Sequence, residues 1–326
     1  MALAEETIPA GEAQLISLLR QKIVDTRPDG KRDAHQKALG LVKANFTVLH
    51  GLSDELKVGL FADPPGNYRA WIRFSNATAQ DDDIPDARGM AIKVLGVPGE
   101  KILEHEKNEE THDFVLVSHN VFIGANVREF AIIADKKEKE ELPEFLREDP
   151  RLAAIFTATL RKFKNLLGTD YHSTTPYLFG DGRAVKYLVR RQNDSIELQE
   201  NEADLTSALK ANLEQHGHVF DFMIQFQKDE DTMPIEDASV AWSEDESPFI
   251  KVAEIEIFAQ DIDNDKRRAL ANTISYTPWH CLPEHRPLGG INRARKVIYE
   301  AVSIARHDEL GEPREEPTTD DFDAIP

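Results

Sequence analysis

The stretch NYRAWIRFSNA, residues 67–77, carries the pattern that decides the fold. Ile72 and Phe74 are apolar, whereas Arg73 and Ser75, which alternate with them, are polar. Successive side chains of a strand point to opposite faces of a sheet, so this period of two predicts a strand with one apolar and one polar face. We expect Arg73 and Ser75 to share the polar face.

Further stretches rich in β-branched and aromatic residues resemble strands. Loops or helical segments separate them, not crossovers of regular helix length, which favours an antiparallel sheet over a parallel one. These stretches are MAIKVLG (90–96), DFVLVSH (113–119), AVKYLVRRQ (184–192), FDFMIQFQ (220–227) and VAEIEIFA (252–259). The sequence therefore predicts an α+β fold, an antiparallel β-barrel with attached α-helices.

Helical spacing of apolar residues marks the segments between these strands. Helices are expected at residues 11–24, before a turn at 27–30, at 140–167 in two pieces divided by Pro150, and at 203–217. The most regular helical pattern is INRARKVIYEAVSIARHDEL, residues 291–310. Its apolar stripe consists of Ile291, Ala294, Ile298, Val302 and Ala305.

Length and charge set the limits of the functional interpretation. The chain has 326 residues, 40% of them hydrophobic, which is enough for a large core. With 59 acidic and 39 basic residues its formal charge is −20, which argues against general binding to nucleic acid or to anionic membranes. We expect one domain at residues 1–310 and an acidic tail at 311–326.

The location of the protein is inferred from what the sequence contains. A single cysteine, Cys281, excludes an internal disulfide framework and fits a reducing compartment. The acidic start does not resemble a signal peptide, and no stretch approaches the roughly 20 apolar residues of a membrane span. We expect a cytoplasmic protein without a membrane span.

Two short clusters at opposite ends of the chain point to haem chemistry. Arg295 and Tyr299 are four residues apart and share one helix face, and an adjacent arginine favours the phenolate that a ferric iron requires. His35, three residues after Arg32, could move protons between the oxygens of a bound peroxide. Each cluster alone has an ordinary explanation, as part of an amphipathic helix or as a hydrogen-bonded histidine.

In their order along the chain, these motifs resemble the haem catalases, and especially short catalase-related proteins that retain only the barrel core. The resemblance rests on Arg32-x-x-His35, IRFSNA (72–77), PDARGMAIKVLG (85–96), SPFIKVAEIEI (247–257) and RKVIY (295–299). It runs from about residue 30 to residue 304. It implies a catalase-like β-barrel, a haem b cofactor and, for this cofactor class, a small-molecule peroxide with a reducing co-substrate.

The resemblance also implies roles for single residues. Tyr299 would be the axial iron ligand with Arg295 as its partner, and His35 the distal acid and base with Ser75 beside it. Arg32 and Arg73 would face the haem propionates, since arginine suits buried carboxylates. Phe122 would shield the peroxide site. We further expect a homo-oligomer.

One departure from the family pattern concerns the residues just before the strand at Asp113. Catalases place an asparagine there, which helps to orient the peroxide, whereas this chain reads NEETH at 108–112 and we assign Thr111 to the catalytic set. We therefore expect peroxidase turnover through a ferryl intermediate, with dismutation as the weaker reaction. A fatty-acid hydroperoxide isomerase and a non-enzymatic haem-binding barrel remain alternatives.

Two other parts of the sequence are weaker candidates for binding iron or another metal. Tyr276 is followed by a nearby proline, but Asn272 stands four residues before it where the motif has an arginine. The run from His280 through Cys281 to His285 contains metal-ligating residue types, yet it holds a proline and lacks a second ligand pair. We read it as a loop that leads into the helix at 291–310.

Overall fold

The computed structural model describes residues 6, 8–62, 64–192 and 197–326. Within them, one antiparallel sheet has the strand order β5-β4-β3-β2-β1-β9-β8-β7-β6. Pairing of β5 with β7 closes eight of these strands into a ring, and β6 is attached to β7 outside the ring. The strands are β1 (Ala38–Val48), β2 (Asn67–Asn76), β3 (Arg88–Leu95), β4 (Thr111–Val117), β5 (Tyr171–His172), β6 (Tyr177–Leu178), β7 (Ala184–Arg191), β8 (His218–Phe226) and β9 (Ile250–Ile257).

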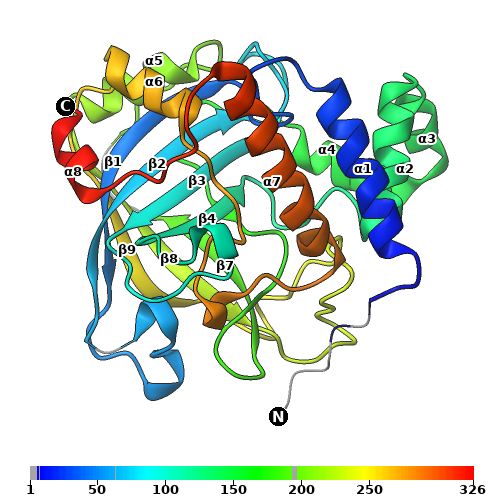
Figure 1. Cartoon of the computed structure of the whole chain (residues 1–326), viewed down its shortest axis with the longest axis horizontal. Helices are drawn as coiled ribbons and strands as arrows, with labels where there is room; N and C mark the ends of the chain where they lie inside the picture. The colour runs from blue at the N-terminus through cyan, green and yellow to red at the C-terminus, as the bar shows by residue number, and fades with distance from the viewer. Residues whose placement is uncertain (1–5, 7, 63, 193–196) are drawn as a thin grey trace.

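Helices surround this barrel, and the expected α+β fold is confirmed. They are α1 (Glu12–Thr26), α2 (Val127–Glu138), α3 (Leu142–Glu148), α4 (Pro150–Thr159), α5 (Leu205–Leu213), α6 (Asp265–Thr273), α7 (Gly290–Leu310) and α8 (Thr319–Ala324). Figure 1 shows α7 crossing the outer face of β2, β3 and β4, with α1 packed beside it. The arrangement leaves one helix face opposite the outside of the barrel wall.

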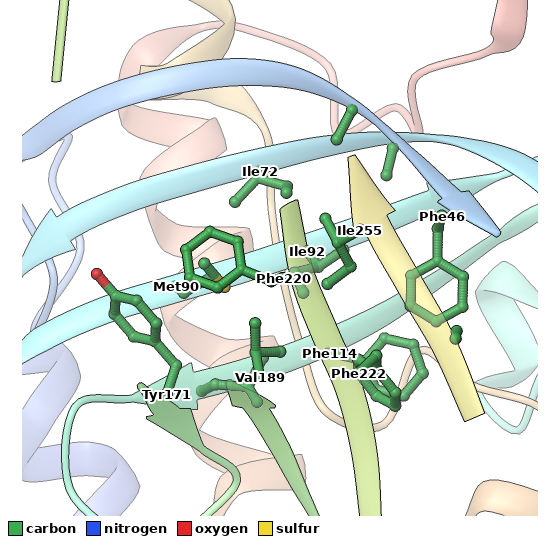
Figure 2. Packing of buried hydrophobic residues seen from close by; sticks show 14 of the residues in the cluster. Phe46, Ile72, Met90, Ile92, Phe114, Tyr171, Val189, Phe220, Phe222 and Ile255 are labelled. Carbon is green, nitrogen blue, oxygen red and sulfur yellow. The ribbon is translucent and has the colours of Figure 1, made fainter. Parts of the chain in front are cut away.

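The interior of the barrel is filled by aromatic and branched side chains (Figure 2). The ring centroids of Phe114 and Phe222 lie 4.7 Å apart, and Phe46 is 5.1 Å from Phe222. Ile72 and Phe74 of β2 are fully buried in this cluster, as their alternation predicted. A small barrel packed in this way has no room for a cofactor, so the face available for one is the outside of the wall.

Two predicted segments differ from the structure. Pro150 does separate two helices, but α4 ends at Thr159, and Leu166 and Leu167 instead pack into the barrel core. Strand β1 begins three residues after His35, and its bounds were not predicted from the sequence. It forms the centre of the sheet order, and its burial alternates strictly from Val42 to Val48, with one interruption where Leu41 and Val42 are both buried.

Residues 311–326 were expected to form an acidic tail, but they pack on the barrel. Helix α8 begins with a capping box at Thr318, and Phe322 is buried against Trp71 at a centroid distance of 5.0 Å. The acidic composition of this segment predicted a free tail. One buried aromatic ring and one buried carboxylate are nevertheless enough to hold the segment on the barrel.

That carboxylate is Glu316, part of a buried charge network. Lys93, which is fully buried on β3, contacts Glu316 at 2.5 Å and Asp113 at 2.6 Å. Burial alone would lower the pKa of Lys93, but these two carboxylates raise it above its ordinary value. The terminal segment is therefore attached to the barrel by a paired internal charge.

His280 extends the same network. Its Nδ1 lies 2.5 Å from a Glu106 carboxylate oxygen, and its Nε2 lies 2.5 Å from Thr111 Oγ1. Thr111 donates its own hydrogen to Glu316 at 2.8 Å, so its oxygen accepts from His280. Lys93 and Arg314, which contacts Glu106, place positive charge beside the carboxylates of this network.

The positive charges in this network disfavour metal binding. Ligand atoms of Glu106, His280 and Glu316 all lie within 4.8 Å of one another, a spacing that a metal ion could use. Lys93 and Arg314 already contact those two glutamates, so a cation entering here would meet positive charge. We interpret the cluster as structural. Separately, no helix among the described residues is long and apolar enough to cross a membrane.

We predict that Lys93→Met destabilises the fold by about 3–5 kcal/mol, because two buried carboxylates lose their counter-charge. Urea unfolding followed by circular dichroism measures the change. Lys162→Met is the control, since its pair with Asp83 is exposed to solvent and contributes little to stability. Equal stabilities of the two variants would show that the network does not hold the terminal segment.

Candidate functional site

A cleft lies between the outer face of β2–β4 and helix α7. It encloses about 780 Å³ of empty space, counting the part that is open to solvent. Small residues of β3, Gly89 and Ala91, line the barrel side, while Ile298 and Val302 of α7 line the helix side. The polar lining comprises Arg32, Asp33, His35, Arg73, Ser75, Ser275, Tyr276, Tyr299, Ser303 and Arg306.

The helix side of the cleft carries Tyr299. A guanidinium nitrogen of Arg295 lies 3.4 Å from the phenol oxygen, and the guanidinium carbon lies 5.2 Å from the ring centroid. Arg295 is oriented from behind by Asn292 Oδ1 at 3.1 Å and Thr175 Oγ1 at 3.3 Å. Burial would lower the pKa of Arg295, but Tyr299 raises it, so the cation next to the phenol is retained.

The barrel side of the cleft carries His35 on the loop before β1. Its Nδ1 lies 3.0 Å from Ser75 Oγ, which leaves Nε2 for another partner. Burial, reinforced by the charge of Arg73, lowers the pKa of His35 to about 4, so the ring is neutral near pH 7. The structure thus brings together His35 and Ser75, as the sequence predicted, and places a neutral imidazole in the cleft.

The backbone holds His35 in an unusual conformation. Its φ is 58°, in the left-handed region that few residues other than glycine adopt, and its N–H donates to Ala77 O at 2.7 Å. Gly89 allows the ring to lie flat on β3. A Cβ at position 89 would come within 2.5 Å of His35 Nδ1 and 2.8 Å of Ser75 Oγ. Glycine is therefore required there by close approach, a role that sequence reasoning missed.

Three arginines meet at one end of the cleft without a carboxylate partner among the described residues. Arg73 donates to the carbonyls of Ala271 and Gln36 at 3.0 and 3.2 Å, and Arg32 likewise contacts backbone carbonyls. Arg306 donates to Thr273 O at 3.0 Å and to Ser275 Oγ at 2.7 Å.

Burial, with mutual repulsion for Arg32 and Arg306, lowers the pKa values of these arginines. Burial and the charges of Arg73 and Arg306 hold the pKa of Arg32 well below its usual range. Burial and Arg73 also lower the pKa of Arg306 to about 10. Buried cations are normally paired, so this end of the cleft is complementary to an anionic group. Sequence reasoning missed Arg306, although its spacing of seven from Tyr299 places both on one helix face.

Three predicted site residues do not line the cleft: Arg295, which contacts Tyr299, and Thr111 and Phe122, which lie elsewhere. Thr111 lies at the far end of β4, opposite Leu95, where it contacts His280 and Glu316. The ring of Phe122 packs on Phe130 of α2 at 5.3 Å, and its N–H donates to Ala238 O. The order of motifs along the chain does not determine the path of the loops between them, so the positions of Thr111 and Phe122 could not be placed from the sequence.

Tyr276 does line the cleft, opposite α7. Its hydroxyl is buried without a hydrogen-bond partner among the described residues, and Lys93 lies 5.4 Å from its ring. Burial raises the pKa of Tyr276 above its ordinary value. Among the described residues no arginine donates a hydrogen bond to its oxygen, whereas Arg295 donates to Tyr299. The charges of Arg73 and Arg32 act on Tyr276 without such a contact.

No family model matches the sequence, and no curated protein matches it. Solved structures do. A bacterial catalase superposes with a TM-score of 0.65 at 17% identity over 97% of this chain and 66% of its own. A fungal catalase gives 0.67 at 15% identity over 95% and 65%. Catalase A from Saccharomyces cerevisiae gives 0.68 at 16% identity over 96% and 69%. The chain spans about two thirds of the length of these proteins, and it has the catalase fold.

Proposed function

We propose that the chain is a haem-dependent oxidoreductase of the peroxidase or catalase type, acting on hydrogen peroxide or organic hydroperoxides. The observation that supports this most is that Arg32, Arg73 and Arg306, which have no carboxylate partner among the described residues, lie at one end of a cleft. The opposite walls of that cleft carry His35 and Tyr299. Haem b would match this cleft, because its two propionates are the missing anions and its flat ring suits a space between a sheet and a helix.

Each residue then has a defined task. Tyr299 would supply the phenol oxygen to ferric iron, with the positive charge of Arg295 beside it. The bound haem would supply the redox chemistry that splits the O–O bond. His35, neutral and oriented by Ser75, would accept the hydroperoxide proton at Nε2 and deliver it to the departing oxygen.

The residues that line the cleft favour peroxidase turnover over dismutation of hydrogen peroxide. Among the described residues, those around the cleft include neither asparagine nor glutamine, and the wall beside His35 is formed by Gly89, Met90, Val115 and Leu116. A second peroxide must be oriented to act as a two-electron donor, whereas a peroxidase substrate can give up electrons singly. We propose peroxidase turnover as the principal reaction and dismutation as the slower one.

We predict that Tyr299→Phe abolishes or greatly weakens stable haem ligation, because it removes the proposed iron ligand. Tyr276→Phe is the matched control. It removes a hydroxyl that has no partner and should leave the haem spectrum unchanged. Absorption spectra of both variants after haem loading make the comparison. Loss of the spectrum in Tyr276→Phe and its retention in Tyr299→Phe would reverse the assignment.

We predict that His35→Ala retains haem but reacts with peroxide roughly 10²-fold more slowly, the usual scale for a lost acid and base. Stopped-flow spectroscopy gives the rate constant. In the unsubstituted protein the base is active while neutral, above its pKa of about 4, so the rate constant should stay level through neutral pH and fall only in acid, below about pH 5. An unchanged rate in a haem-replete His35→Ala sample would remove His35 from the mechanism.

The proposed function is tested by two assays on one haem-loaded sample. An oxygen electrode follows dismutation of hydrogen peroxide, and a phenolic donor follows peroxidation with hydrogen peroxide or a small alkyl hydroperoxide. We expect donor oxidation to exceed oxygen release, with both lost in Tyr299→Phe. Fast oxygen release without donor oxidation would contradict the preferred turnover. Conversion of a fatty-acid hydroperoxide without any electron donor would indicate an isomerase. If none of these peroxides reacts, the protein would be a non-enzymatic haem-binding barrel.

A further inference from the structure

Lys186 of β7 is a buried amine outside the cleft described above. Its neighbours Val185 and Tyr187 belong to the barrel core, so Lys186 points to the outer side of the wall. The side chain is only 4% exposed. Its Nζ donates to Val240 O at 3.0 Å and lies 5.0 Å from the ring centroid of Trp242.

No carboxylate of the described residues lies within ion-pair distance of Lys186. Asp237 acts on it only from farther away, and Glu244, at the rim of the same cavity, contacts Arg190 at 2.9 Å. Burial therefore lowers the pKa of Lys186 to about 7, with Asp237 opposing the shift. A large fraction of this amine is uncharged at neutral pH.

Lys93 provides the internal contrast. It is equally inaccessible, yet two carboxylates contact it at 2.5 and 2.6 Å and keep it charged. Burial thus has opposite consequences for the two lysines. A neutral amine in an apolar setting is the form that attacks carbonyl carbon, whereas an ammonium ion has no lone pair for that reaction.

Lys186 also has space in front of it. It lines a cavity of about 590 Å³ of empty space, counting the part that is open to solvent, together with His172, Tyr187, Trp242 and Phe249. Exposed residues Asn120 and Glu244 stand at its rim, so small molecules can enter from solvent.

The titratable groups that face this cavity do not supply a fixed positive or negative partner. Burial, together with nearby cationic groups, lowers the pKa of His172 to about 3, so its ring is neutral. The charge of Glu244 is taken up by Arg190.

We propose that Lys186 is a reactive amine that captures small aldehydes as a reversible imine. The Nζ lone pair attacks the carbonyl carbon while the C=O π electrons move to oxygen. A proton passes from nitrogen to that oxygen, and the resulting carbinolamine loses water as the nitrogen lone pair forms the C=N bond. One aldehyde is consumed and one water released, with no change in oxidation state. This site does not depend on haem or on the function proposed above.

The test is competitive reductive alkylation of the full native chain with propanal and cyanoborohydride, which reduces the imine and traps it. Peptide mass spectrometry reports the rate at each lysine. At pH 7 we expect Lys186 to be alkylated at least about 10-fold faster than exposed Lys162, because an ordinary lysine titrates near 10.4. The advantage should shrink as pH approaches 10, when the other lysines also become neutral.

Two comparisons keep the result interpretable. Lys93 should remain unmodified in the native protein and become modified after unfolding in urea, which shows that its peptide is detectable. Arg190→Gln frees Glu244 without touching the cleft, and should lower the rate at Lys186 if a nearby carboxylate then favours the ammonium ion. Native Lys186 that reacts no faster than Lys162 at pH 7, or only after unfolding, would overturn the proposal.

Discussion

The two-sidedness of the barrel wall is the constraint on which the rest of the structure depends. In β2, Ile72 and Phe74 fill the interior, so Arg73 and Ser75 must face outward, where α7 crosses the wall. A shift of one residue in the pairing with β1 or β3 would place the arginine in the hydrophobic interior and the phenylalanine in the cleft. Packing of the core thereby positions the polar site on the opposite face.

Charge balance explains three different regions of the molecule by one physical rule. A buried charge needs an opposite charge nearby, or it must be neutralised. Around Lys93 the balance is complete, and the result is a structural connection to residues 311–326. Around Arg32, Arg73 and Arg306 it is incomplete, which points to an anionic ligand. At Lys186 no carboxylate of the described residues lies within ion-pair distance, and burial lowers the pKa of the amine to about 7.

The barrel side of the cleft is organised before any ligand arrives. His35 has a left-handed backbone, which is held by the hydrogen bond to Ala77, and its ring is confined by Ser75 and by the bare backbone at Gly89. A side chain so constrained loses little further freedom when a substrate binds. Asp86 supports the neighbouring loop by accepting the N–H groups of Thr78 and Ala79.

The amino-acid sequence by itself determined the elements whose side chains repeat with a clear period. The strand at 67–77 was predictable because apolar and polar residues alternate along it, and the helix at 291–310 because its apolar residues form one stripe. The pair Arg295 and Tyr299 followed from helical spacing. The bounds of strand β1 were not predicted, although its buried residues alternate from Val42 to Val48. Only the tertiary structure decided that Arg306 joins Arg32 and Arg73, that Gly89 makes room for His35, that Thr111 and Phe122 lie elsewhere, and that residues 311–326 pack on the barrel. These outcomes depend on contacts between segments far apart in the chain, and local periodicity carries no information about such contacts.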